Sequence, residues 1–344
     1  MLKMNLGLKV CTLLAFLLIL STVSGFESCQ VDEKCVRLYL CPHMYHFAYN
    51  ERMAHIQCRT DRTANAEDQR IYVCCPEPGN ILPDHKTCGR RPGTHRIFGG
   101  VKAQPNEFPW MALLLDRKGK AACGGSLINN RYVVTAAHCV TRVKIDSVRL
   151  GEHDTSSDPD IIRPKNERPR WAAPHLEIEV ENIVVHRGFQ HTPLRNDIAL
   201  IRLKLPVRYT EEIRPICVLG IHISLINATH HPKFEIAGWG ITESNNNSNV
   251  LLKATIKQVE NECFKEHRYL NETQICAGGQ EGKDTCFGDS GGPLMGTMIH
   301  YIRYRQELVY LAGIVSHGGE NCGSAGVYTK MESFIYWVLY FLRA

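Results

Sequence analysis

Short runs of apolar residues, separated by turn residues, make up most of the chain after Ile97. Such regular spacing, without amphipathic segments of helical length, is typical of an antiparallel β-barrel or sandwich. Near the end, Phe334, Val338, Leu339 and Leu342 recur at helical spacing, which predicts a closing helix that packs on the barrel by its apolar face. The expected fold class is therefore all-β with a C-terminal helix. The apolar runs are Trp110–Leu115, Arg131–Thr135, Ile183–Val185, Ile198–Leu203, Phe234–Ala237 and Val309–Val315.

The N-terminal pattern is different, because a single apolar stretch extends over Val10–Leu20. It follows Lys3 and Lys9 and ends in small residues up to Gly25, which is the layout of a secretory signal peptide over residues 1–25. A membrane-spanning helix needs about 20 apolar residues, so this stretch is too short to be an anchor. The apolar segment near the C-terminus, Phe334–Leu342, is shorter still and cannot span a membrane either. We therefore expect a secreted, extracellular protein with no membrane partner.

The composition excludes several classes of partner. Hydrophobic residues make up 44% and charged residues 22% of the 344 positions, as in ordinary globular proteins. The net charge of +5 is scattered, which gives no reason to expect a nucleic-acid partner. Cys11 would be lost with the signal peptide, and the other fourteen of the 15 cysteines form an even set that favours disulfides in a secreted chain. No cysteine and histidine spacing fits a zinc site, so we expect no metal bound through thiolates.

Cysteine density divides the rest of the chain into a small and a large unit. Six cysteines lie within residues 28–76, a segment with too little apolar periodicity for a core of its own, so disulfides are needed to hold it. Residues 77–96 are rich in Pro and Gly, which indicates an exposed linker of the kind that proteases cut. Residues 97–344 form the large domain. A chain of 344 residues is long enough for this division.

The segment Gly288–Pro293, with the sequence GDSGGP, is the strongest chemical motif. A serine hydroxyl group needs a base to take its proton and donors to stabilise the oxyanion. The glycines allow a sharp turn, so that the N–H groups of Gly288 and Ser290 can point at one oxygen atom. We predict that Ser290 is a nucleophile and that these two residues form an oxyanion hole. The alternative is a Gly-Pro turn that happens to contain serine, and six residues in this order make it remote.

Two further segments supply the partners of such a serine. His138 in the sequence TAAHC offers a base, and Asp197 in NDIAL offers a carboxylate that would fix the tautomer of the imidazole. One of 16 histidines is by itself more often structural or exposed, and an aspartate before an apolar strand is more often a turn residue. The order His, Asp, Ser is that of chymotrypsin and differs from the orders in subtilisin and the α/β-hydrolases. We therefore predict a catalytic triad of His138, Asp197 and Ser290.

From Ile97 to its end the chain resembles the chymotrypsin family of serine proteases. The resemblance implies trypsin-like serine endopeptidase activity. It also implies a double barrel, in which two antiparallel β-barrels of six strands each hold the triad in the cleft between them. The motifs that carry it are Pro109-Trp110, those of His138, Asp197 and Ser290, Gly238-Trp239-Gly240, and Gly326-Val327-Tyr328.

The same resemblance implies a preference for Arg or Lys before the cleaved bond. Asp284 stands six residues before Ser290, where trypsin-like members carry the aspartate at the base of their primary pocket. Gly318 and Gly326 match the two glycines of the pocket wall, and Ser316 belongs to the strand that lines the cleft. A carboxylate that faces a substrate cation would explain the preference.

Two departures from the family lie beside this pocket. His317 stands where most members have Trp or Phe, and the loop between Cys322 and Gly326 looks short. Both bear on the finer subsite preference and leave the triad unaffected.

The resemblance also implies a zymogen that is cut after Arg96, in the sequence RIFGG. Cleavage would free the α-amino group of Ile97, which in this family turns inward and pairs with the carboxylate at the position of Asp289. That pair orders the oxyanion hole and the pocket, and a buried carboxylate beside the nucleophile needs such a partner. Since the cut follows an arginine, the expected activator is itself a trypsin-like protease.

The six cysteines of residues 28–76, which end in adjacent Cys74 and Cys75, resemble the clip domain of arthropod clip-domain serine proteases. By themselves six cysteines allow 15 pairings. The resemblance implies seven disulfides, which would use all fourteen cysteines. They are Cys29–Cys74, Cys35–Cys58 and Cys41–Cys75 in the clip domain, Cys123–Cys139, Cys263–Cys276 and Cys286–Cys322 in the protease domain, and Cys88–Cys217 between linker and protease domain.

Two smaller signals concern modification and metal binding. Asn227, Asn246 and Asn271 begin sequences that fit the acceptor pattern for N-glycosylation. Glu152 begins an acidic loop in the region where some trypsin-like relatives bind calcium. The ligand set cannot be completed from the sequence, and acidic loops are usually only solvated. Calcium is therefore an alternative to the expected absence of any cofactor.

Through its clip domain the chain resembles proteases that activate prophenoloxidase, in melanisation, or that activate Toll-ligand precursors. We therefore expect an endopeptidase of an extracellular immune or developmental cascade. Its expected partners are an upstream trypsin-like activator, a downstream zymogen or pro-ligand as substrate, and serpin inhibitors. One alternative is a catalytically inactive clip-domain homologue that acts as a binding cofactor, but such relatives replace the nucleophile, whereas Ser290 is intact. Another is a digestive trypsin, which gives no reason for a clip domain.

Overall fold

The chain divides into two compact units, Met1–Glu77 and Pro78–Ala344. The computed structural model describes residues 29, 33–37, 57–60, 71–76, 79, 81–91, 101–162, 168–219, 233–240, 248–259, 263, 270–279, 290–300, 306–318 and 324–342. The predicted signal peptide lies outside these residues. Within them, no helix combines the length and the apolar character that a membrane span requires.

The first unit contains a small antiparallel sheet that is cross-linked by disulfides. Cys29 is bonded to Cys74, and Cys35 to Cys58. Of the side chains described here, those of Val73 and Cys74 are buried. Cross-links of this kind stabilise a small domain by restricting its unfolded chain. The strands, in the sheet order β1-β3-β2, are β1 (Glu33–Arg37), β3 (Ile71–Pro76) and β2 (Gln57–Thr60).

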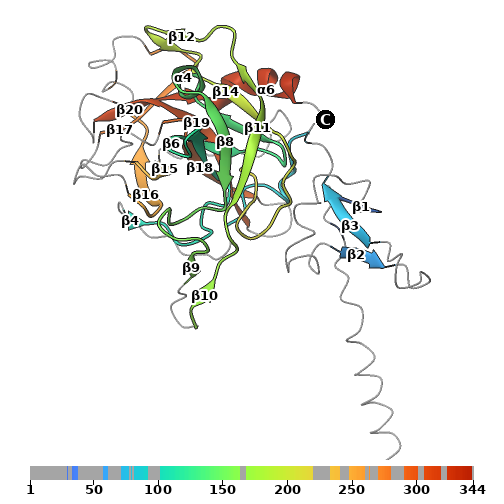
Figure 1. Ribbon diagram of the computed structural model, residues 1–344. Coiled ribbons are helices and arrows are strands. Elements are labelled where there is room, and N and C mark those ends of the chain that lie inside the picture. Colours follow the sequence, from blue (N-terminus) through green and yellow to red (C-terminus); the bar gives the residue numbers. More distant parts are fainter. Residues whose placement is uncertain are drawn as a thin grey trace, which may run out of the picture. The chain divides into compact units, whose positions relative to one another are not determined.

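The second unit contains a closed barrel of six antiparallel strands, in the order β11-β14-β7-β6-β5-β8. Four of them, β6, β8, β11 and β14, are labelled in Figure 1. Its interior is filled by aliphatic side chains such as Leu114, Val134 and Leu200, all fully buried. Burial of this apolar surface is the main force that closes the barrel. The strands are β5 (Met111–Asp116), β6 (Ala121–Leu127), β7 (Tyr132–Thr135), β8 (Ile145–Leu150), β11 (Leu176–Val185) and β14 (Ala199–Leu203). A short helix, α4 (Ala137–Arg142), follows β7. Two small antiparallel pairs of strands lie between barrel strands. The pair between β8 and β11 is β9 (Ile161–Ile162) with β10 (Arg170–Trp171), and the pair between β11 and β14 is β12 (Gln190–His191) with β13 (Leu194–Arg195).

The second sheet of this unit has seven strands, in the order β17-β20-β19-β18-β15-β16-β4. This sheet is a half-barrel, in contrast to the second closed barrel of six strands that the family resemblance implies. An isolated antiparallel bridge between Gln258 and Ala277 joins the end of β16 to β17, and the Val259 N–H donates to the carbonyl oxygen of Cys276 at 3.0 Å. The first residues of β16 pair with β4 instead, which adds a seventh strand. The strands are β4 (Val101–Lys102), β15 (Lys233–Gly238), β16 (Leu252–Lys257), β17 (Gln274–Gly278), β18 (Pro293–His300), β19 (Gln306–His317) and β20 (Ala325–Lys330).

Each predicted apolar run coincides with a strand, although Trp110, Arg131 and Ile198 each lie one residue before the strand begins. Several other strands have no such run. Ile183–Val185 is only the end of the ten-residue β11, whose first half carries exposed glutamates. β6 has the sequence AACGGSL, in which small residues replace the expected β-branched ones. Its residues from Cys123 on are buried all the same, because they pack against neighbouring strands on both sides.

The predicted closing helix is present, preceded by one turn of 3₁₀-helix, η4 (Met331–Phe334), and continued as α6 (Ile335–Phe341). Phe334, Val338 and Leu342 are buried as expected, together with Ile335. Leu339 is 42% exposed, so its place on the apolar face was wrong. Positions 334, 338 and 342 follow one another at intervals of four residues, and Leu339 lies about 100° around the helix from Val338.

Candidate active site

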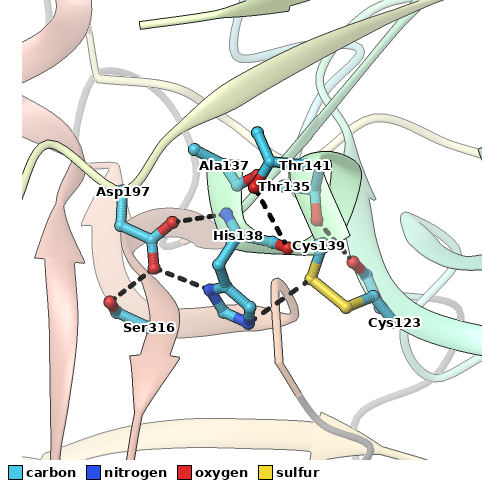
Figure 2. The surroundings of a disulfide bond; sticks show 9 residues. Cys123, Thr135, Ala137, His138, Cys139, Thr141, Asp197 and Ser316 are labelled. Carbon is cyan, nitrogen blue, oxygen red and sulfur yellow. Dashed lines mark hydrogen bonds and ion pairs between the residues drawn. A yellow bond between two sulfur atoms is a disulfide. The ribbon is translucent and has the colours of Figure 1, made fainter. Parts of the chain in front are cut away.

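His138 and Asp197 are joined by two hydrogen bonds at the edge of the first barrel (Figure 2). The backbone N–H of His138 donates to Asp197 Oδ1 at 2.9 Å, and His138 Nδ1 lies 2.7 Å from Asp197 Oδ2. His138 is the second residue of α4, just after β7, whereas Asp197 comes just before β14. Because β7 and β14 pair in the barrel, residues 59 positions apart in the chain meet here.

The carboxyl group of Asp197 is surrounded by donors although the residue is only 1% exposed. Ser316 Oγ donates to Asp197 Oδ2 at 2.6 Å, and Thr329 Oγ1 donates to the backbone carbonyl oxygen of Asp197 at 2.9 Å. Burial opposes ionisation, but the hydrogen bonds from His138 and Ser316 outweigh it and hold the pKa of Asp197 below its ordinary value. Asp197 is therefore an anionic acceptor, which favours the tautomer of His138 with its proton on Nδ1.

This tautomer leaves His138 Nε2 unprotonated, so that it can act as a base. Nε2 lies 3.7 Å from Cys139 Sγ, and Cys139 forms a disulfide with Cys123 of β6. Within α4, Thr141 Oγ1 donates to the carbonyl oxygen of Ala137 at 3.0 Å (Figure 2). The disulfide ties the short helix, and with it the imidazole, to β6 of the barrel, whereas the hydrogen bond from Thr141 stabilises the helix itself.

Ser290 and Gly291 form a turn that packs on the strands leading to His138. The N–H of Gly124 in β6 donates to the carbonyl oxygen of Ser290 at 2.9 Å, and the N–H of Gly291 donates to that of Val315 in β19 at 2.9 Å. Gly291 has a φ of +79°, and a Cβ atom there would lie 2.2 Å from Thr135 Oγ1. Only glycine fits this position, as the glycines of the motif led us to expect.

The described contacts fix Ser290 through its backbone, and a hydrogen bond from its hydroxyl group to His138 Nε2 is not among them. Catalytic hydrogen bonds are often long without substrate and tighten in the complex. Ten predicted site residues lie outside the described residues. They are Arg96, Ile97, Asp284, Gly288 and Asp289 of the proposed catalytic and activation machinery, the disulfide residues Cys41, Cys286 and Cys322, and the glycosylation residues Asn227 and Asn246.

Three predicted substrate-binding residues lie on two neighbouring strands. Ser316 is buried near the end of β19, Gly318 follows that strand and is exposed, and Gly326 is a buried residue of β20. β19 and β20 are antiparallel, with His317 opposite Val327. The pairing brings these three residues to the same strand ends, beside the carboxylate that Ser316 binds.

Sequence reasoning missed part of the support around Asp197. Ser316 is predicted as a substrate-binding residue, yet its hydroxyl group also holds the buried carboxylate. Thr329 is not predicted at all, because no local motif contains it and only the pairing of β19 with β20 brings it close. His317 Nδ1 lies 3.3 Å from Ser316 Oγ, so this departure from the family touches the same group.

The described cysteines form five disulfides, which are five of the seven pairs that the family resemblance implies. Cys75 is disulfide-bonded as well, and Cys41, Cys286 and Cys322 lie outside the described residues. The five are Cys29–Cys74, Cys35–Cys58, Cys88–Cys217, Cys123–Cys139 and Cys263–Cys276.

Glu152, the residue predicted as an alternative calcium ligand, is buried and engaged by the chain itself. Arg149 Nη1 and His175 Nδ1 lie 3.3 Å and 3.5 Å from its Oε2, and the His153 N–H donates to its Oε1 at 3.0 Å. Burial raises the pKa of Glu152. In the described part of the chain, the two groups of potential metal ligands both contain disulfide cysteines, and neither includes Glu152. The Glu152 carboxylate is thus paired with Arg149 and His175 within the described residues, and calcium binding stays an untested alternative.

Asn271 is the one predicted glycosylation residue that is described, since Asn227 and Asn246 lie outside. It is partly exposed in the turn before β17. Asn271 Oδ1 accepts hydrogen bonds from the backbone N–H and the hydroxyl group of Thr273, at 3.0 Å and 2.7 Å. Use of this acceptor remains a prediction.

Known proteins are similar to this chain over most of its length. The family model described as Trypsin matches residues 97–338. The Spaetzle-processing enzyme of Drosophila melanogaster is 36% identical over 370 residues, which cover 91% of this chain and 91% of that protein. Melanization protease 1 of the same species is 39% identical and covers 93% of this chain and 82% of that protein.

Two solved structures are similar as well. The crystal structure of the Drosophila Grass clip serine protease of the Toll pathway has a TM-score of 0.67 and 28% identity, covering 86% of each chain. Neuropsin, a serine protease expressed in the limbic system of mouse brain, has a TM-score of 0.56 and 30% identity, covering 72% of this chain and 100% of that one.

Proposed function

This chain belongs to the trypsin family of serine proteases and to its clip-domain members, and on that premise we propose that it is a secreted zymogen of an Arg/Lys-specific endopeptidase. The observation that supports the catalytic part is the buried carboxylate of Asp197. It binds His138 through two hydrogen bonds, while the turn of Ser290 packs on the strand that leads to His138. A base, its orienting carboxylate and a serine on a tight turn are the parts that acyl transfer requires.

In the proposed mechanism, His138 Nε2 takes the proton of Ser290 as the serine oxygen attacks the carbonyl carbon of the substrate. The N–H groups of Gly288 and Ser290 stabilise the oxyanion of the tetrahedral intermediate. The ionised Asp197 stabilises the imidazolium, which then gives its proton to the leaving amine. Water hydrolyses the resulting acyl-enzyme by the same route, and the free serine returns.

The proposed preference for Arg and Lys comes from one carboxylate group and from a pocket wall that is formed by glycines. Asp284 would pair with the cation of the substrate residue before the cleaved bond. Gly318 and Gly326, on the strand ends beside Ser316, leave room for a long side chain. Arg and Lys fulfil both conditions.

The proposed activation is a cut after Arg96, after which the ammonium group of Ile97 pairs with Asp289. The anchoring of the following strand supports this. Lys102 in β4 pairs with Leu252, and the Ala103 N–H donates to the carbonyl oxygen of Leu251 at 2.8 Å. The segment between Ile97 and β4 contains two consecutive glycines, which would allow the new N-terminus to turn toward Asp289.

The proposed setting is an extracellular protease cascade. Relatives with high identity carry names that refer to Spaetzle processing and to melanisation, and the similar solved structure belongs to the Toll pathway. We propose that an upstream trypsin-like protease activates this chain, that its substrates are a downstream zymogen or pro-ligand, and that serpins inhibit it.

The test compares the wild-type chain with Arg96→Gln and Ser290→Ala, before and after treatment with immobilised trypsin that is then removed. Hydrolysis of a short Arg amide should appear only in the treated wild type. Ser290→Ala should be cut normally yet lose roughly 10⁵–10⁶-fold in kcat, as nucleophile variants of serine proteases do. Activity of the untreated wild type or of Arg96→Gln would contradict zymogen control, and near-normal turnover by Ser290→Ala would contradict the assigned nucleophile.

A further inference from the structure

The linker before the proposed activation site is fastened to the protease domain by its backbone. The Gly89 N–H donates to the carbonyl oxygen of Pro215 at 2.8 Å, and the Gly89 carbonyl oxygen accepts from the Val309 N–H at 3.0 Å. Next to it, the disulfide between Cys88 and Cys217 is buried. Gly89 has a φ of +64°, and a Cβ atom there would lie 2.3 Å from the carbonyl oxygen of Val309. The chain is therefore held in one conformation as far as Gly89.

Arg91 adds a second attachment two residues later. Arg91 Nη2 lies 2.5 Å from Glu235 Oε2, and its guanidinium carbon lies 4.8 Å from the centre of the Phe108 ring. The side chains of Arg91 and Glu235 are only 16% and 21% exposed. An ion pair that is shielded from water and stacked on an aromatic ring is stronger than an exposed one.

The chain is fixed again at β4, on the same sheet. Glu235 belongs to β15, which pairs with β16, and β16 pairs with β4 from Val101 on. Between these two attachments, residues 92–100 have the sequence PGTHRIFGG, in which Arg96 is the only Arg or Lys. A basic pair, Arg90-Arg91, lies just upstream of this segment, within the part that is fastened to the protease domain.

A protease can cut only a segment that extends into its own cleft over several residues, which a fastened backbone cannot do. We propose that the Arg91–Glu235 ion pair is a clamp that protects the Arg90–Arg91 bond and so restricts activating cleavage to Arg96. A cut after Arg90 would leave Ile97 in a peptide bond, without the free ammonium group that activation requires. The inference rests on the proposed activation at Arg96 and adds a reason for its selectivity.

The test uses Glu235→Gln in the full chain with Ser290→Ala, so that the protein cannot cut itself. Limiting immobilised trypsin serves as the probe, and mass spectrometry identifies the new N-termini. The parent chain should show Ile97, with little product that begins at Arg91. Glu235→Gln should raise the fraction cut after Arg90 about ten-fold, because cleavage follows the population of the locally opened segment.

Two variants serve as controls. Glu235→Asp keeps a carboxylate and should restore most of the protection. Glu179→Gln removes an ion pair of the same length, to Lys204, on the exposed side of β11 and should leave the products unchanged. With Ser290 intact, fully activated Glu235→Gln should hydrolyse a short Arg amide at the wild-type rate, which shows that the protease domain is folded.

Unchanged products from Glu235→Gln, or a parent chain that is cut as readily after Arg90 as after Arg96, would overturn the clamp. A parent chain that shows no Ile97 N-terminus would instead overturn the proposed activation site. The comparison at Arg90 would still decide whether the ion pair protects that bond.

Discussion

Two aspartates have opposite tasks in the proposed site, and their surroundings differ accordingly. The charge of Asp197 is satisfied within the protein by His138 and Ser316, which keeps its pKa low despite burial. A specificity carboxylate must instead remain available for the cation of the substrate. Asp284 is the residue to which we assign that task, by its spacing from Ser290.

Replacing Asp284 by Ser keeps the cavity and removes the countercharge. The value of kcat/KM for Arg substrates should fall by roughly three to four orders of magnitude, because the guanidinium group would be desolvated without a partner. Substrates with Leu or Phe before the cleaved bond should lose far less. Steady-state kinetics of the activated variant on matched peptide amides measures both, and a retained Arg preference would show that another residue lines the pocket.

At the scale of elements, the site depends on how closely the Ser290 turn approaches β6 and β7. Gly124 of β6 binds the Ser290 carbonyl oxygen, and Gly291 lies against Thr135 at the end of β7. Since β7 leads directly into α4, the turn and the helix of His138 share one support. Any side chain at position 291 would separate them.

Gly291→Ala should therefore destabilise the protein by roughly 2–4 kcal/mol, from the unfavourable backbone conformation and from overpacking against Thr135 and Gly124. The activated variant should also lose most of its kcat. Gly119→Ala is the matched control, because Gly119 has a φ of +73° but nothing within 4 Å of the added methyl group. Thermal unfolding of both variants separates the cost of the backbone conformation, which both share, from the cost of overpacking, which only Gly291→Ala has. Equal losses of stability in the two variants would mean that the contact of position 291 with Thr135 and Gly124 contributes nothing.

At the scale of the whole molecule, the disulfide between Cys88 and Cys217 determines what remains joined after activation. Cys88 precedes the proposed cut at Arg96 and Cys217 follows it, 129 positions away from Cys88. The clip segment is continuous in sequence with Cys88. Cleavage would therefore leave an enzyme of two chains linked by one bridge, with the clip domain still attached.

Chain cut at Arg96 should migrate near its full size on a denaturing gel without reductant and as two bands after reduction. The double variant Cys88→Ala/Cys217→Ala should give two bands in both conditions, because the covalent link is gone. If the cut wild-type chain separated without reductant, a different connection between the two chains would be needed to keep the clip domain on the enzyme.

The sequence by itself determined the family and supplied the triad candidates, because this chemistry depends on short local motifs. The division into signal peptide, clip domain, linker and protease domain stays a prediction. A nucleophile turn such as GDSGGP needs its glycines at fixed positions. The apolar runs of β5, β7 and β14 indicate strands in the core of a barrel or a sandwich, and the family resemblance favoured the barrel. The cysteine count favoured disulfides, whereas the choice among pairings came from the family resemblance. The all-β fold with a C-terminal helix could thus be predicted from the sequence alone.

Only the tertiary structure decided the contacts between residues that are distant in the chain. Ser316 and Thr329 reach Asp197 because β19 and β20 pair with one another, and no local pattern marks either residue for that role. Arg91 likewise meets Glu235 across 144 positions. Periodicity specifies which face of an element is apolar, but the polar groups that meet there depend on strand pairing, which the sequence pattern alone does not specify.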